Sequence, residues 1–371
     1  MRSVFVIRLI LVLTTFAGMT AGLTAQDDPP DSESVLGFPL LSTTSESPPC
    51  VETATTDRGS SPPRRISLSE VFPMFTGDAS LEGVEPISDE LQSYGTQIFV
   101  DYDAFRGIAD GGWENNGIRT GFNFATRLGQ FSELTGIGLQ VGASVGVYDW
   151  GGTDYRLQNQ NLPETQGFFT YGLYRKPTEG SHITGGLVQD WSYNRTYGVF
   201  GQSPTLSQLR GQLGYAVSAS NEFGVWGTAH VLSSTLNVPT FGPTKWQSVN
   251  QLSAYWHHKW HAGGPDTWIS VGQPSYDRLA GGGSLGDYLV TATAACPLSD
   301  VVSVFSSVTY LHQSGAPGGE SSNDEAWNFT VGISIYPGRN ARSNTVAGQR
   351  WMPLLPVANN GSFLVDTNKG Y

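Results

Sequence analysis

From about residue 96 to residue 336, apolar and polar residues alternate with a period of two over segments of about ten residues. The clearest segment is 327–336, in which every odd position is apolar and every even position before Tyr336 is polar or glycine. Successive side chains of a β-strand point to opposite faces, so this pattern predicts a strand with one apolar face. A shift of one residue would exchange the two faces, so the pattern also predicts which side chains share a face.

Segments of this kind predict twelve strands and an all-β chain. Their expected ranges are 96–105, 117–127, 137–147, 168–176, 182–193, 208–219, 222–232, 248–259, 267–273, 287–296, 301–312 and 327–336.

The connections between these strands alternate between short and long. The short ones are 128–135, 177–181, 220–221, 261–266 and 297–300, and the long ones include 151–166, 194–207, 233–247 and 313–325. An even strand count with short turns at one end and long loops at the other is typical of bacterial outer-membrane barrels, whose short turns lie in the periplasm. Closure also removes the sheet edges that lipid does not tolerate. The sequence therefore predicts a closed antiparallel up-and-down transmembrane β-barrel of about twelve strands.

The composition is typical of a protein whose surface is covered in large part by something other than water. Only 14% of the 371 residues are charged, whereas 12% are aromatic and 46 are glycine. No run of 18 apolar residues follows the N-terminus, which excludes a helical membrane protein on length. A net charge of −12 argues against nucleic acid as a partner, because phosphate binding needs a basic surface.

The N-terminus has the order of a secretory signal, in which basic residues up to Arg8 precede an apolar run through Gly18. We expect the signal peptide to be residues 1–25, with cleavage after Ala25, although small residues from 21 onward offer other cleavage points. The alternative is that this segment forms a buried N-terminal strand.

Residues 26–93 are rich in Ser, Thr, Pro, Asp and Glu and are expected to form a disordered periplasmic linker. An apolar island within it, Val71–Phe75, either docks on or plugs the barrel or is an apolar patch in a disordered tail. The barrel is expected at 94–337 and a C-terminal periplasmic extension at 338–371.

The two cysteines, Cys50 and Cys296, permit one disulfide. The expected topology puts both in the oxidising periplasm, where a bond would tether the linker to the barrel. Alternatively, Cys296 is a small apolar residue turned toward lipid.

Polar residues at inward positions are the candidate functional residues. Those expected to line the lumen are Asp101, Asp103, Arg119, Arg127, Gln140, Arg210, Gln212 and His257. Mixed charges on opposite walls would orient solutes in a narrow pore. Alternatively, these side chains pair with one another and fill a closed lumen.

The run His257–His261 contains three histidines, but neighbouring side chains on a strand point to opposite faces, so only His257 and His261 would share one. No nearby Asp, Glu or Cys completes a metal site, and no metal or other cofactor is expected. An aromatic girdle at the membrane interface, formed by Trp256, Trp260 and Trp268, explains the local composition better.

The same region argues against an enzyme. Ser253 and His257 share a face but lie about 13 Å apart along the strand at 3.3 Å per residue, too far for a nucleophile and its base. The chain also contains no Gly-x-Ser-x-Gly nucleophile motif.

Over residues 94–337 the chain resembles bacterial outer-membrane β-barrel proteins as a class, on the pattern of strands and connections described above. The runs 335–343 and 348–353 are similar to an uncharacterised exported family of planctomycetes. The resemblance implies an outer-membrane location and lipid as a partner. One departure is that barrels of this class end on an aromatic residue, whereas here Tyr336 is followed by 35 residues.

Three functions remain open at this point. The first is a porin-like pore for passive uptake of small solutes. The second is a structural or surface-interaction barrel with a plugged lumen, whose loops bind surface glycans through Trp113, Tyr155, Tyr197 and Phe200. The third is a secreted, soluble β-sandwich that binds carbohydrate.

Overall fold

The structure is a computed structural model. It describes residues 94–110, 113–154, 161–177, 181–239, 241–260, 264–274, 279, 285–312, 325–338, 341 and 351–369. The expected signal peptide, the linker with its island Val71–Phe75, and Cys50 lie outside the described residues.

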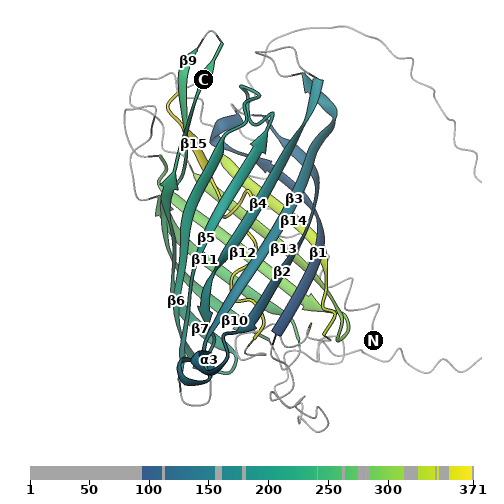
Figure 1. Cartoon of the computed structure of the whole chain (residues 1–371), viewed down its shortest axis with the longest axis vertical. Coiled ribbons are helices and arrows are strands. Elements are labelled where there is room, and N and C mark those ends of the chain that lie inside the picture. The colour runs from purple at the N-terminus through teal and green to yellow at the C-terminus, as the bar shows by residue number, and fades with distance from the viewer. Residues whose placement is uncertain are drawn as a thin grey trace, which may run out of the picture. The chain divides into compact units, whose positions relative to one another are not determined.

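Twelve strands close into an antiparallel barrel (Figure 1). They are β1 (Tyr94–Arg106), β2 (Asn115–Arg127), β3 (Ile137–Asp154), β4 (Asn161–Arg175), β5 (Ile183–Arg195), β6 (Thr205–Ser218), β7 (Asn221–Leu232), β10 (Gln251–Lys259), β11 (Asp266–Pro274), β12 (Tyr288–Pro297), β13 (Val302–His312) and β14 (Ala326–Ile335). Each of these strands pairs with the next one in this series, so that β7 pairs with β10, and β1 pairs with β14 to complete the ring. The predicted fold class and all twelve predicted strands are confirmed.

The two faces of the wall are those that the alternation predicted. On β1, Ile98 and Val100 are 45% and 48% exposed on the outside, whereas Asp101 and Asp103 are buried on the inside. On β14, Thr330 and Ser334 are buried inward and Ile333 is 47% exposed outward. Apolar residues therefore cover the outer face of the barrel, and polar residues line its interior.

We call the two ends of the barrel the turn end and the loop end. The turn end carries the short connections, including α3 (Gln130–Thr135), which ends at Gly136 in the left-handed conformation with φ of 75° that glycine adopts without strain. The loop end carries η2 (Ile108–Asp110) and a hairpin of β8 (Ser234–Val238) and β9 (Gly242–Ser248). No helix among the described residues is long and apolar enough to cross a membrane.

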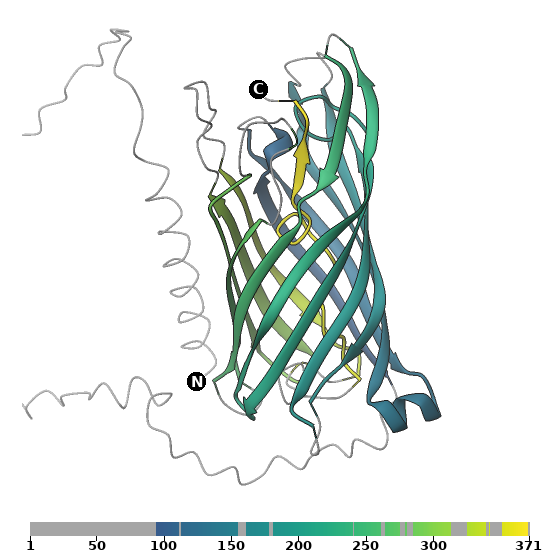
Figure 2. The same ribbon diagram turned by 90° about the vertical axis from the view of Figure 1, so that its left-hand side faces the viewer.

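The C-terminal segment runs through the inside of the barrel (Figure 2). A Cβ atom on Gly95, at the start of β1, would lie 2.4 Å from Met352 Sδ, so the segment enters at the turn end. It reaches the loop end as β15 (Val365–Thr367), which pairs with β9. The expectation of an extension beyond the barrel is therefore corrected for residues 351–369. A segment surrounded by wall on every side has no solvent face, so its sequence shows no alternation that would reveal its place.

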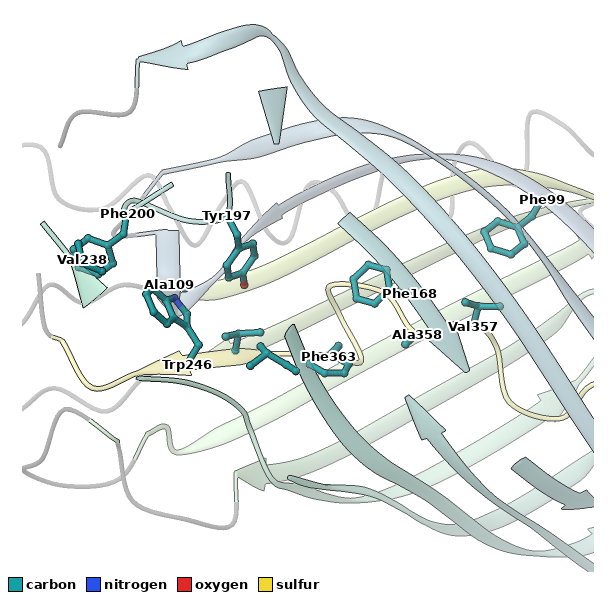
Figure 3. Packing of buried hydrophobic residues seen from close by; sticks show 12 residues of the cluster. Phe99, Ala109, Phe168, Tyr197, Phe200, Val238, Trp246, Val357, Ala358 and Phe363 are labelled. Carbon is teal, nitrogen blue, oxygen red and sulfur yellow. The ribbon is translucent and has the colours of Figure 1, made fainter. Parts of the chain in front are cut away.

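An apolar cluster joins this segment to the wall and to the loop end (Figure 3). Its members are Phe99, Ala109, Phe168, Tyr197, Phe200, Leu206, Val238, Trp246, Val357, Ala358, Phe363 and Val365. Tyr197 is 4% and Phe200 1% exposed, so the expected role of these two loop aromatics as a glycan surface is wrong. Trp113 is 46% exposed, and Tyr155 lies outside the described residues.

Cys296 is a free, buried thiol on β12. Its Sγ lies 3.9 Å from the carbonyl oxygen of Pro297. Because the suggested partner Cys50 is outside the described residues, the disulfide stays a prediction.

The pairing of β1 with β14 predicts a cross-link that closes the barrel. Val100 and Ile333 are register partners on the outer face. In a background without native cysteines, Val100→Cys with Ile333→Cys should form a disulfide, because directly opposed strand residues meet the Cα separation of about 4.4–6.8 Å that the bond needs. Val100→Cys with Ile335→Cys is the matched control, displaced by two residues. Electrophoresis without reductant separates the products, and equal cross-linking of both pairs would contradict the register.

Candidate functional site

Two buried ion pairs lie on the lumen wall. Arg119 Nη2 is 2.8 Å from Asp101 Oδ2, and Arg119 Nε donates to Asp101 Oδ1 at 3.2 Å. Arg210 Nε and Nη2 donate to the two carboxylate oxygens of Asp190 at 2.8 and 3.0 Å. Such two-point contacts fix the plane of the guanidinium as well as its charge. The candidates Asp101, Arg119 and Arg210 therefore hold defined positions inside the barrel.

Both arginines also hold the C-terminal segment, whose residues 351–364 we call the plug. Arg119 Nη1 donates to the carbonyl oxygen of Ala358 at 3.2 Å, and Arg210 Nη2 donates to that of Pro356 at 2.7 Å. Thus each guanidinium is bonded on one side to its carboxylate and on the other to the plug backbone. This arrangement satisfies donors that burial would otherwise leave without water.

Amide side chains hold the middle of the plug. The candidate Gln140 donates from Nε2 to the carbonyl oxygen of Leu355 at 2.9 Å, while its Oε1 accepts from the backbone N–H groups of Leu354 and Leu355, each at 3.2 Å. Asn123 Nδ2 donates to the same carbonyl at 2.9 Å. Because the plug is not part of the barrel sheet, these side chains supply the hydrogen bonds that a neighbouring strand would otherwise supply.

Asp103, another predicted lumen residue, binds the upper part of the plug. Asn360 Nδ2 lies 3.2 Å from Asp103 Oδ2 and 2.8 Å from Gln166 Oε1. Asp103 also accepts from Tyr148 OH at 2.8 Å and from Thr330 Oγ1 at 3.0 Å. The carboxylate is therefore surrounded by donors from β3, β14 and the plug.

Glycines in the wall make room for the plug. A Cβ atom on Gly186 would lie 2.5 Å from Leu355 Cδ1, and one on Gly142 would lie 2.6 Å from Val357 Cγ2. Real Cβ atoms do not approach this closely, so any side chain at these inward positions would press on the plug. The wall therefore has a fitted seat for this segment.

The other candidates lie around the part of the lumen that the plug leaves free. Gln212 Nε2 donates to Tyr255 OH at 3.0 Å, and Tyr255 OH donates to Glu222 Oε1 at 2.5 Å. His257 Nε2 lies 2.5 Å from Asp266 Oδ1. Arg127 is on the inward face but at the turn end, where its side chain is 44% exposed and pairs with Glu133 at 3.5 Å.

The structure differs from two expectations, for Trp268 and for the surroundings of His257. Trp268 faces the lumen and packs against Trp226, so it is not part of an outer aromatic girdle, whereas Trp256 and Trp260 are 38% and 50% exposed. A carboxylate does approach His257, because the β10–β11 pairing brings Asp266 beside it. No group of three or more metal-binding side chains occurs among the described residues.

Asp190, Glu222 and Asp266 are lumen residues that the sequence reasoning missed. Asp190 and Glu222 occupy inward positions of β5 and β7, so the same alternation that selected the other candidates contained this signal. Asp266 falls in a turn predicted from the sequence, and only the observed start of β11 places it on the wall.

A cavity of about 280 Å³ lies beside the plug. Its wall comes from β1, β2, β6, β7 and β10–β14, where β12 and β13 contribute only small side chains and one phenylalanine. These inward residues are Thr291, Thr293, Ala295, Phe305, Ser307 and Thr309. The plug is bonded mainly to the opposite wall, so the small side chains of β12 and β13 leave the space empty.

Lys176 lines the cavity at the turn end, directly after β4. Burial lowers the pKa of its ammonium group to about 8, although the carboxylates of Asp266 and Glu222 oppose this shift. At neutral pH the group is therefore still mostly charged and is balanced by these two acids.

A family model described as "Family of unknown function (DUF6666)" matches residues 95–365. The chain belongs to this family. The DUF6666 match covers the barrel and continues through the plug to the first residue of β15. A comparison with curated proteins gives no match.

Solved structures with a similar course of the chain include several bacterial proteins. An outer-membrane channel from Pseudomonas putida F1 is 11% identical with a TM-score of 0.43, over 68% of this chain and 100% of that one. The NanC porin is 10% identical with a TM-score of 0.39, over 64% and 98% of the two chains. Outer-membrane phospholipase A from Escherichia coli is 12% identical with a TM-score of 0.37, over 67% and 94%.

The fitted seat predicts that one inward substitution displaces the plug while its outward neighbour does not. Gly186→Trp should expel residues near Leu355, because the new side chain takes their space. Gly185→Trp is the matched control, since the nearest atom to its Cβ is 3.7 Å away. Limited proteolysis with mass spectrometry should release C-terminal fragments from the first variant only. Equal protection in both variants, with the barrel folded, would contradict the seat.

Proposed function

We propose that this protein is an outer-membrane β-barrel for small solutes whose lumen is kept closed by its own C-terminal segment. The observation that carries the proposal is the coexistence of a fitted plug and a cavity of about 280 Å³ beside it in one closed barrel. A barrel with only a structural role would need no cavity in its lumen, and an open porin would need no seat for a plug.

The outer face supports a bilayer location. Large apolar side chains are exposed on strand after strand, for example Leu187 at 58%, Leu213 at 59% and Leu252 at 58%. Soluble monomers rarely expose such a continuous apolar surface, because water opposes it. A closed barrel with an apolar outside and a polar inside satisfies every strand hydrogen bond within lipid.

The loop end supports a closed resting state. A second apolar cluster there, separate from the one in Figure 3, consists of Ile108, Val249, Leu285, Leu289, Leu311, Ala326 and Leu364. The backbone N–H of Val249 donates to the carbonyl oxygen of Leu364 at 2.8 Å, which ties the end of the plug to the chain that follows β9. A solute that crosses the barrel must therefore pass the plug and this apolar closure, so we infer that the plug moves during uptake.

The size and lining of the cavity also limit which solutes can pass through the barrel. Its lining reaches from Lys176 and Asp266 at the turn end to Thr309 and Ser362 farther up the lumen. A space of this size lies near the lower limit of ligand pockets, about 300–1,000 Å³. The pore that we propose is thus selective for small molecules rather than a wide diffusion channel.

The bilayer location predicts a depth-dependent cost for charge on the outer face of β14. Val331→Arg, in the middle of the strand, should destabilise the barrel by about 2–4 kcal/mol, and Ile335→Arg, at its end, by about 0–1 kcal/mol. Both side chains lie on the same outward face. Unfolding in lipid vesicles, followed by the heat-dependent shift in gel migration, measures the difference. Equal costs would favour a soluble protein over a membrane barrel.

The plug predicts low conductance in the full chain and a higher one without the plug. Deletion of residues 351–371 should raise the single-channel conductance in planar bilayers several-fold, because it removes a segment that runs through the lumen. Gly186→Trp should act in the same direction with the complete chain, and Gly185→Trp should not. If the full chain and all variants are silent although folded, the barrel is structural; if the full chain conducts as well as the deletion, the plug does not close it.

A further inference from the structure

We propose that the cavity beside the plug is a binding site for one neutral sugar ring. This inference rests on the proposed function, because it names the class of solute that the barrel takes. The aromatic rings, hydroxyl groups and charges around the cavity support it.

Aromatic rings form one side of the site. Trp226 on β7 and Trp268 on β11 both line the cavity, with ring centroids 6.3 Å apart and planes at 74°. Tyr255 stacks on Trp268 at 5.4 Å and 28°, which holds the indole in place. The face of a fixed aromatic ring packs well against the C–H face of a sugar, which is apolar although the edge of the sugar is polar.

Hydroxyl groups follow directly in register from this aromatic side. Trp268 is the register partner of Thr293 on β12, Thr293 that of Ser307 on β13, and Ser307 that of Thr330 on β14. Opposed residues on one face have Cβ atoms about 4.5–5.5 Å apart. The tryptophan is therefore flanked by a row of hydroxyls on the same face of the wall.

Thr330 Oγ1 already donates to Asp103, but the hydroxyls on β12 and β13 still have free hydrogen-bonding capacity. Thr293 Oγ1 donates to Ser307 Oγ at 3.5 Å, and Thr291 and Thr309 join their Oγ1 atoms at 3.2 Å. A hydroxyl has one donor and two acceptor positions, so one contact leaves most of that capacity unused. A ligand made only of apolar atoms would bury these groups without partners, which costs free energy, whereas a polyhydroxylated ligand would bond to them.

The charges around the cavity indicate a neutral ligand. Arg119 and Arg210 are each bonded to a carboxylate, and His257 is bonded to Asp266. Glu222 accepts from Tyr255 and also from Thr184 Oγ1 at 2.7 Å. A charged ligand would have to compete with these internal partners, while a neutral sugar leaves them intact.

Calorimetry and saturation-transfer NMR on the full chain test the site, in a detergent without a sugar headgroup. The probes are D-glucose and D-galactose, with D-glucuronate as the charged comparison. At least one neutral hexose should bind, and Trp268→Ala should weaken its binding by about tenfold through loss of the ring face. Trp256→Ala is the matched control, because this tryptophan is 38% exposed on the outer face of the neighbouring strand.

Thr293→Val adds a test that keeps the shape of the wall while removing one hydroxyl. It should weaken hexose binding several-fold even if Trp268→Ala fails to fold, with folding checked by the heat-dependent gel shift. The proposal is overturned if neither hexose binds at millimolar concentration, if D-glucuronate binds better, or if the lumen and control variants bind alike. Hexose binding without conductance in any variant would support the site and contradict the pore, so the two failures are distinguishable.

Discussion

The structure depends on one constraint: charged and polar groups inside a closed barrel must find their partners inside it. Arg119 and Arg210 are almost fully buried, and each faces a carboxylate on a nearby strand. Breaking a buried pair of this kind costs about 3–5 kcal/mol, because the remaining charge is left without water. The guanidinium groups have more donors than one carboxylate accepts, and the carbonyl oxygens of Ala358 and Pro356 take the others. The wall and the plug are therefore stabilised by the same groups.

This shared network explains why the C-terminal segment lies in the lumen without strand pairing along most of its length. Its backbone is bonded to side chains such as Gln140 and Asn123, and its apolar side chains occupy places that wall glycines leave open. Hydrogen bonds from separate side chains can break independently, whereas the hydrogen bonds between two paired strands break in sequence along the strands. A segment held in this way combines a defined resting position with the possibility of release, which is what a gate requires.

The asymmetry of the lumen follows from side-chain size. Bulky amides and arginines on β2, β3 and β6 reach the plug, while threonine, serine and alanine on β12 and β13 stop short of it. The cavity is the space between these small side chains and the plug, so both the wall and the C-terminal segment set its chemistry. Any movement of the plug would change the site, which couples solute binding to closure in the function that we propose.

The sequence by itself determined the strands, the two faces of the wall and most residues of the lumen, because side-chain direction in a strand follows from position alone. Asp101, Arg119 and Gln140 could be assigned to the interior in this way. The tertiary structure decided which charges pair, since Asp190 and Arg210 are 20 residues apart in the chain and meet only through the register of β5 with β6. It also decided that Trp268 faces inward, that Tyr197 and Phe200 are buried, and that residues 351–364 run through the lumen. These features depend on which distant parts of the chain meet inside the barrel. A periodic pattern along one strand carries no information about such contacts.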